Sequence, residues 1–83
     1  MENIDKIRKF INRFTGGKVY SDTEDIFAEG LVNSLFITQL AIFIEMEFDL
    51  ELQKDDLEIR NICSVDAIVL LIETKKAGGR VIT

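Results

Sequence analysis

The chain has 83 residues, of which 47% are apolar, and a net charge of −5, so it can form one compact domain but has no room for a separate catalytic cleft. Its single cysteine, Cys63, and its lack of histidine exclude an internal disulfide, argue against a metal site and fit a reducing cytoplasm. Eleven acidic residues and one basic residue fall within 20–59, and this acidic block would repel nucleic acid.

The first predicted helix covers residues 3–14. Its apolar positions recur at helical spacing and form one stripe: Ile4, Ile7, Ile11 and Phe14. Gly16 and Gly17 follow directly and should end the helix, because glycine readily adopts the left-handed conformation that closes a helix.

Residues 15–33 form a long connection rich in glycine, serine and acidic residues, and a loop of this length in so small a domain is typically functional or mobile. We expect Ile26 and Phe27 to attach its middle to the core. The second helix should run over 34–48, with Asn33 as its N-cap, because the amide oxygen of asparagine can accept hydrogen bonds from the first free backbone amides.

A short helical turn is expected at 55–60, where Asp55 and Glu58 have the spacing of a capping box. The last helix should cover 64–76 with Ser64 as N-cap, and two lysines in its last turn suit the helix dipole.

No segment alternates as a strand, and the tail 78–83 is expected to fray. The sequence therefore predicts a single all-α domain over 1–83, a small four-helix bundle with three main helices and one short helix.

The second predicted helix carries apolar residues on two sides. At 100° per residue, one arc should face the core and consists of Ile37, Leu40, Ala41, Ile44 and Phe48. Leu35, Ile42 and Met46 cluster on the opposite arc, next to the end that Ser34 opens. A helix in so small a bundle cannot bury its whole circumference, so we expect an exposed apolar docking surface there, unless the loop 15–33 covers it.

Ser34 at the start of this helix is the candidate functional residue. A serine nucleophile would need a base, and the chain contains no histidine to serve as one, so we expect no catalytic residue and no enzyme activity. A hydroxyl at the positive end of a helix is instead suited to carry an attached phosphodiester.

Several motifs follow one another in a characteristic order between Asp25 and Glu73. They are Asp25-Ile26-Phe27, Gly30, Ser34-Leu35, Leu40, Ile44, Glu47-Phe48-Asp49 and Ser64-Val65-Asp66-Ala67-Ile68. In this order of motifs the chain resembles the acyl carrier protein family. The resemblance implies an acyl-carrier-like helical bundle in which a phosphopantetheinyl transferase esterifies Ser34 with 4′-phosphopantetheine from coenzyme A. The thiol of that arm would hold an acyl group as a thioester and present it to other enzymes.

The resemblance also implies a set of partners and a docking surface. The partners would be enzymes that load and modify the acyl group and an acyltransferase or synthase that accepts it. The residues expected to contact them are Asn33, Leu35, Phe36, Gln39, Ile42, Glu45 and Met46.

Two departures from the family pattern favour a dedicated carrier. Asn33 stands where the family usually has aspartate, and the second helix has few of the usual acidic groups on its exposed side. The Gly-Leu-Val-Asn-Ser-Leu form is similar to free-standing carriers of unusual malonyl-type extender units in polyketide or mixed polyketide–nonribosomal peptide biosynthesis. A D-alanyl carrier of teichoic acid modification and an unmodified helical interaction domain remain as alternatives.

Other classes of function fit the residues less well. After Asp22-Thr23-Glu24-Asp25 the loop lacks the glycine and the closing glutamate of a calcium-binding loop. The apolar run 31–44 is too short and too polar to insert into a membrane, and the first residues lack the order of a signal peptide. We expect a monomer in the cytoplasm.

Overall fold

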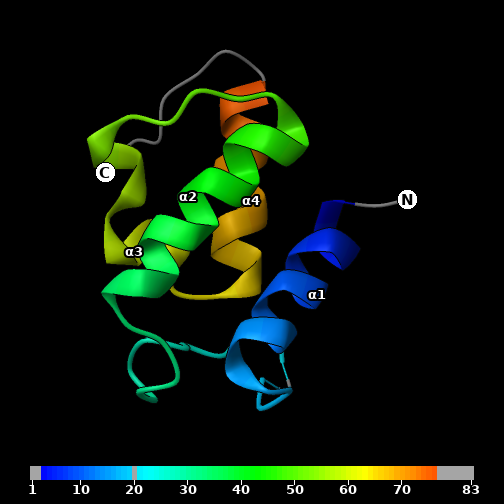
Figure 1. Cartoon of the computed structure of the whole chain (residues 1–83), viewed down its shortest axis with the longest axis vertical. Coiled ribbons are helices and arrows are strands. Elements are labelled where there is room, and N and C mark those ends of the chain that lie inside the picture. Colours follow the sequence, from blue (N-terminus) through cyan, green and yellow to red (C-terminus); the bar gives the residue numbers. More distant parts are fainter. Residues whose placement is uncertain (1–2, 20, 77–83) are drawn as a thin grey trace.

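The computed structural model describes residues 3–19 and 21–76, which form a small helical bundle (Figure 1). Within this part of the chain there are four α-helices, one 3-10 turn and no strand. The elements are α1 (Asn3–Thr15), α2 (Ser34–Phe48), the 3-10 turn η1 (Lys54–Leu57), α3 (Ile59–Ile62) and α4 (Val65–Lys76). The predicted fraying of 78–83 lies outside the described residues.

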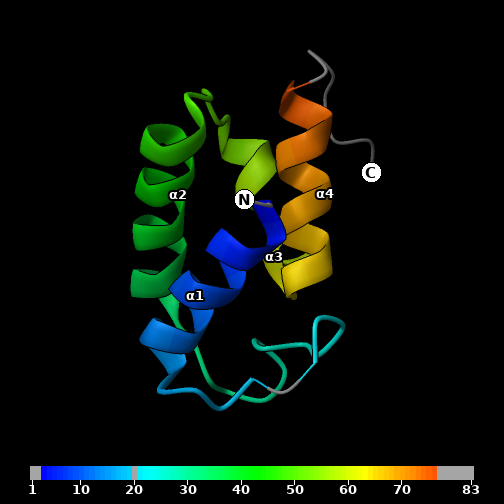
Figure 2. The same cartoon turned by 90° about the vertical axis from the view of Figure 1, so that its right-hand side faces the viewer.

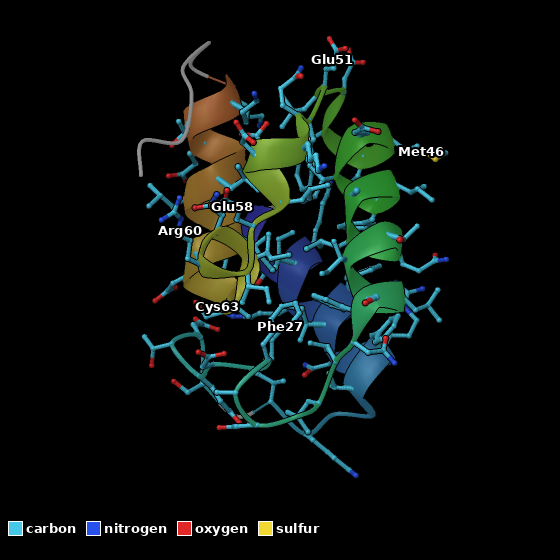
Figure 3. All side chains as sticks on the ribbon, turned by 90° about the vertical axis from the view of Figure 1, so that its left-hand side faces the viewer. Phe27, Met46, Glu51, Glu58, Arg60 and Cys63 are labelled. Carbon is cyan, nitrogen blue, oxygen red and sulfur yellow. The ribbon has the colours of Figure 1, made fainter. Side chains whose placement is uncertain are left out.

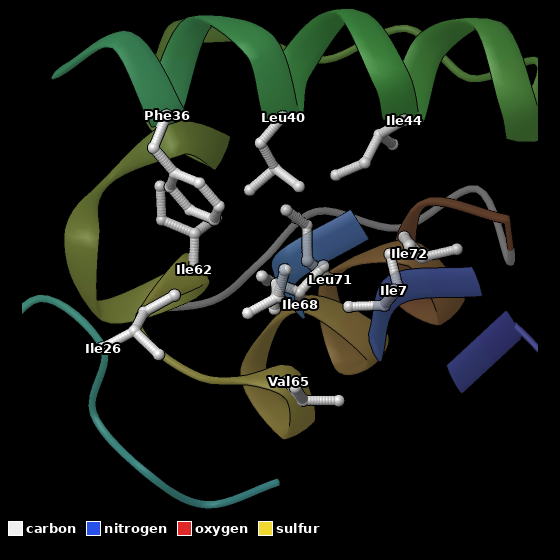
Figure 4. Close-up of a cluster of buried hydrophobic side chains, with 11 residues drawn as sticks. Ile7, Ile26, Phe36, Leu40, Ile44, Ile62, Val65, Ile68, Leu71 and Ile72 are labelled. Atoms are coloured by element: carbon white, nitrogen blue, oxygen red, sulfur yellow. The ribbon is translucent and has the colours of Figure 1, made fainter. Parts of the chain in front are cut away.

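The three long helices surround one core. Figure 2 shows α2 and α4 upright on opposite sides of the bundle, with α1 crossing diagonally between them and the long loop closing the end from which α2 starts. The core consists of eleven buried apolar side chains, most of which are labelled in Figure 4: Ile7, Ile11, Ile26, Phe36, Leu40, Ile44, Ile62, Val65, Ile68, Leu71 and Ile72. Every helix and the long loop contribute to it, so the apolar stripes predicted from the sequence meet in one place.

The predicted bounds of the long helices are confirmed to within one residue. The amide of Ala67 donates to Ser64 Oγ at 3.1 Å, so Ser64 caps α4 as expected. Gly16 and Gly17 both have positive φ directly after α1, as the predicted helix end requires.

The prediction of one short helix at 55–60 was wrong in detail, because the chain forms two short turns there. Glu58 is extended, with φ −66° and ψ 146°, and separates η1 from α3. The capping interaction also uses other residues than Asp55 and Glu58: the Gln53 amide donates to Asp56 Oδ2 at 2.7 Å. Asp56 in turn forms a largely buried ion pair with Lys75 of α4, at 3.0 Å, which joins η1 to the last helix.

The long loop is attached to the bundle at two points. Ile26 is fully buried, and its amide donates to the carbonyl of Cys63 at 2.8 Å, so the expectation that this part of the loop enters the core is confirmed. The backbone carbonyl of Asp22 accepts a hydrogen bond from the Asp66 backbone amide at the start of α4. The carboxylate of Asp22 accepts a hydrogen bond from the Arg8 guanidinium of α1. The loop is therefore held against the junction of α3 and α4.

Candidate functional site at the start of α2

The start of α2 leaves the Ser34 hydroxyl free. Asn33 has extended backbone, and its Oδ1 accepts hydrogen bonds from the amides of Leu35 and Phe36 at 3.1 and 3.4 Å. Asn33 therefore performs the capping predicted for it. Ser34 is exposed, and its hydroxyl has no hydrogen-bond partner among residues 3–19 and 21–76. The helix does not depend on this hydroxyl, which leaves it available to another molecule.

The loop that precedes Ser34 is built from local caps. Asp25 Oδ1 accepts from the amides of Phe27 and Ala28 at 3.1 and 2.9 Å, which forms a tight turn around Ile26. Gly30 follows with φ +74°, a backbone conformation that side chains other than glycine rarely adopt. No atom lies within 4 Å of the position of a Cβ there, so conformation rather than space requires the glycine. These turns bring the chain from the core back to the start of α2.

The first turn of α2 favours an anion beside Ser34. Backbone amides at a helix start carry partial positive charge, and the first turn of α2 contains no acidic side chain. A phosphodiester on Ser34 therefore meets favourable electrostatics on the helix side of the serine.

In the preceding loop, the Glu24 side chain hydrogen-bonds to Glu29 and raises the pKa of the Glu29 carboxyl above its ordinary value of 4.5.

The exposed side of α2 is a strip without charge, formed by Leu35, Gln39, Ile42 and Met46 and called the α2 strip below. Its three apolar side chains are 58%, 48% and 79% exposed, in chain order, so the expectation that they stay uncovered is confirmed. Figure 3 shows Met46 pointing away from the bundle. The long loop does not cover this strip.

One predicted docking residue, Phe36, does not lie on the surface of the protein. Phe36 is completely buried and forms edge-to-face pairs with Phe14 and Phe27, so its placement on the docking surface was wrong. The buried arc of α2 follows Phe36, Leu40 and Ile44, about 60° around the helix from the predicted arc at 100° per residue. The aromatic side chains of α1 and the loop cause this rotation, because they offer Phe36 an apolar site.

The acidic side chains of α2 are both engaged within the protein. Glu45 is partly buried, and its Oε2 accepts a hydrogen bond from the Leu52 backbone amide at 3.0 Å, so this side chain holds the next loop. Glu47 forms an ion pair with Lys6 of α1 at 2.9 Å. The α2 strip thus lacks a free carboxylate beside it on its own helix.

A groove between α1 and α2 was not predicted from the sequence. It encloses about 370 Å³ and is lined by Phe10, Arg13, Phe14, Gln39, Ile42 and Phe43. The signal lay in two aromatic residues on α1 and one on α2, but only the crossing of the helices shows that they form walls of one space.

Cys63 lies half-buried between α3 and α4. Its Sγ is 3.8 Å from the carbonyl oxygen of Arg60. The part of the chain that the structure describes contains no group of three or more potential metal ligands. In the same part, every helix is too short or too polar to cross a bilayer.

Comparison of the chain with models of known protein families and with curated proteins finds no match. The functional conclusion therefore depends on the residues and geometry described above.

Proposed function

We propose that this chain is a carrier protein that bears a 4′-phosphopantetheine arm on Ser34. The observation that carries the proposal is the division of roles at the start of α2, where Asn33 caps the helix and leaves the adjacent hydroxyl exposed and unbonded. A serine that only stabilised the helix start would itself accept those amides, as Ser64 does for α4.

The covalent step would take place at Ser34 Oγ. A separate transferase would remove the hydroxyl proton, and Oγ would attack the phosphorus next to the pantetheine unit of coenzyme A. A phosphodiester bond then forms, and adenosine 3′,5′-bisphosphate leaves. The arm supplies a thiol that holds an acyl group as a thioester.

The residues of this chain fit such an arm. Ser34 lies at the positive end of α2, where the phosphodiester charge is favoured, and no acidic side chain occupies the first turn. The chain contains no histidine that could activate Ser34 as a nucleophile, which supports an attachment point over a catalytic serine.

The uncharged α2 strip supports a specialised partner set. Both acids of α2 are engaged within the protein, so partners would recognise this helix through Leu35, Ile42 and Met46 rather than through carboxylates. Together with Asn33, this favours a dedicated carrier, and we propose an unusual malonyl-type extender unit as its cargo. The exposed strip also supports a second candidate, an unmodified helical domain that binds partners through the same side chains.

The test is co-expression with a promiscuous phosphopantetheinyl transferase, followed by intact-mass measurement. A carrier gains one phosphopantetheine group, and Ser34→Ala abolishes the gain. Ser21→Ala is a matched control, because Ser21 is also an exposed serine of the loop region but should leave the gain unchanged. An unmodified interaction domain shows no gain with any transferase, and a gain that survives Ser34→Ala contradicts the assignment.

A further inference from the structure

The α1–α2 groove has the walls of a small-molecule site. Phe10 of α1 stacks on Phe43 of α2 with ring centroids 4.7 Å apart, and Phe10 also lies 5.9 Å from the buried Phe36. The aromatic walls are thus supported by the core and are formed before any ligand arrives. The volume of about 370 Å³ lies within the range of small-ligand pockets, and the groove is open to solvent along one side.

The polar groups of the groove are a cation and an amide. Arg13 lies at the groove and forms no ion pair with any of residues 3–19 and 21–76. Lys6, on the same helix, does not line the groove and is paired with Glu47. Gln39 adds a carboxamide that can donate hydrogen bonds.

The groove is separate from the proposed attachment point. Phe43 follows Ser34 by nine residues, which places the two about 180° apart around α2 at 100° per residue. An arm that leaves Ser34 therefore starts on the opposite side of the helix from Phe43, whereas Gln39 and Ile42 belong both to the groove and to the α2 strip. A ligand of the groove has to be recognised by the groove itself.

We propose that the α1–α2 groove binds a small carboxylic acid with an aromatic or branched apolar body. The carboxylate is held by the guanidinium of Arg13 with support from the Gln39 amide, and the apolar body lies between the phenyl rings and Ile42. Charge complementarity selects this occupant, because an apolar groove with a guanidinium at its edge favours an anion over a neutral or cationic molecule. The proposal goes beyond the carrier function and does not require modification of Ser34.

The test is a titration of the full-length protein, without an arm, with sodium 4-phenylbutyrate and with the neutral 4-phenylbutanamide. Two-dimensional NMR of backbone amides follows the groove residues. The acid should shift the amides of Phe10, Gln39 and Phe43 in a saturable manner, with a dissociation constant of about 1 mM, as expected for a ligand of this size. The amide should bind about fivefold more weakly.

Variants separate charge from shape. Arg13→Gln should weaken binding of the acid about fivefold and leave the amide unchanged, whereas Lys9→Gln, one turn earlier on α1, should change neither. Ile42→Trp should fill the groove and abolish binding of both compounds. Ser34→Ala should bind the acid like the wild type, so a failure of the carrier proposal would not affect this result.

Three outcomes would overturn the proposal. They are the absence of saturable shifts at the groove, equal affinity for acid and amide, and an Arg13→Gln variant that binds the acid like the wild type. Shifts of the groove amides that depend on protein concentration alone would show that a second copy of the chain occupies the groove, and they would also contradict the proposal.

Discussion

Ile42 and Ile44 of α2 provide a matched test of which side of this helix faces the core. Ile44 is fully buried, whereas Ile42 is 48% exposed on the α2 strip. Replacing either residue by alanine removes the same atoms from the same helix and improves helix propensity by the same amount. The difference in the free energy of unfolding between the two variants therefore reports burial.

The expected difference is large. Ile44→Ala should cost about 2–5 kcal/mol, because it removes a fully buried side chain of the core and leaves a cavity there. Ile42→Ala should cost about 1 kcal/mol or less, because half of that side chain already contacts water and no enclosed cavity forms. At about 4–8 °C per kcal/mol for a domain of this size, the Ile44 variant should melt at least about 8 °C below the wild type.

Urea unfolding followed by far-ultraviolet circular dichroism measures the free energy of unfolding of both variants. The midpoints can be compared if this free energy falls with urea concentration at the same slope in both. Equal losses of stability in the two variants would refute the assigned faces of α2. A larger loss for Ile42→Ala would show that the strip is covered in solution.

Three further predictions concern the contacts that hold the site. Asn33→Ala should lower the free energy of unfolding by about 1 kcal/mol through loss of the cap, whereas Asn33→Asp should retain stability, both measured by urea unfolding. Lys75→Met should cost about 3 kcal/mol in the same assay, because it removes a largely buried cation that pairs with the Asp56 carboxylate; a loss below 1 kcal/mol would contradict that role. The hydrogen bond from the Arg8 guanidinium holds the pKa of Asp22 below its ordinary value of 3.8. The stability that this pair contributes is therefore present above pH 3.8 and is lost as the pH falls further. Asp22→Asn should flatten that part of a plot of unfolding free energy against pH.

The sequence predicted the helices well because their ends carry local signals. Asn33 and Ser64 act as caps as expected, and the paired glycines after α1 have the positive φ that ends a helix. The exposed side chains of the α2 strip could also be predicted, because a small bundle cannot cover both apolar sides of one helix.

Features that depend on contacts distant in sequence were missed. The burial of Phe36 depends on Phe14 and Phe27, which come from α1 and the loop. The engagement of Glu45 depends on the path of the chain after α2, where the Leu52 amide returns to it. The groove beside Arg13 arises only where α1 crosses α2, so no periodicity in either helix could reveal it.

The most direct test of the carrier assignment is the mass of the chain from cells that contain its own transferase. Digestion after Lys18 and Lys54 releases the peptide 19–54, which contains Ser34 together with Ser21 and other hydroxyl residues. Fragment-ion mass spectrometry should locate one phosphopantetheine group, with or without an acyl group on its thiol, on Ser34. An unmodified peptide from such cells, or the group on any other residue, would contradict the account.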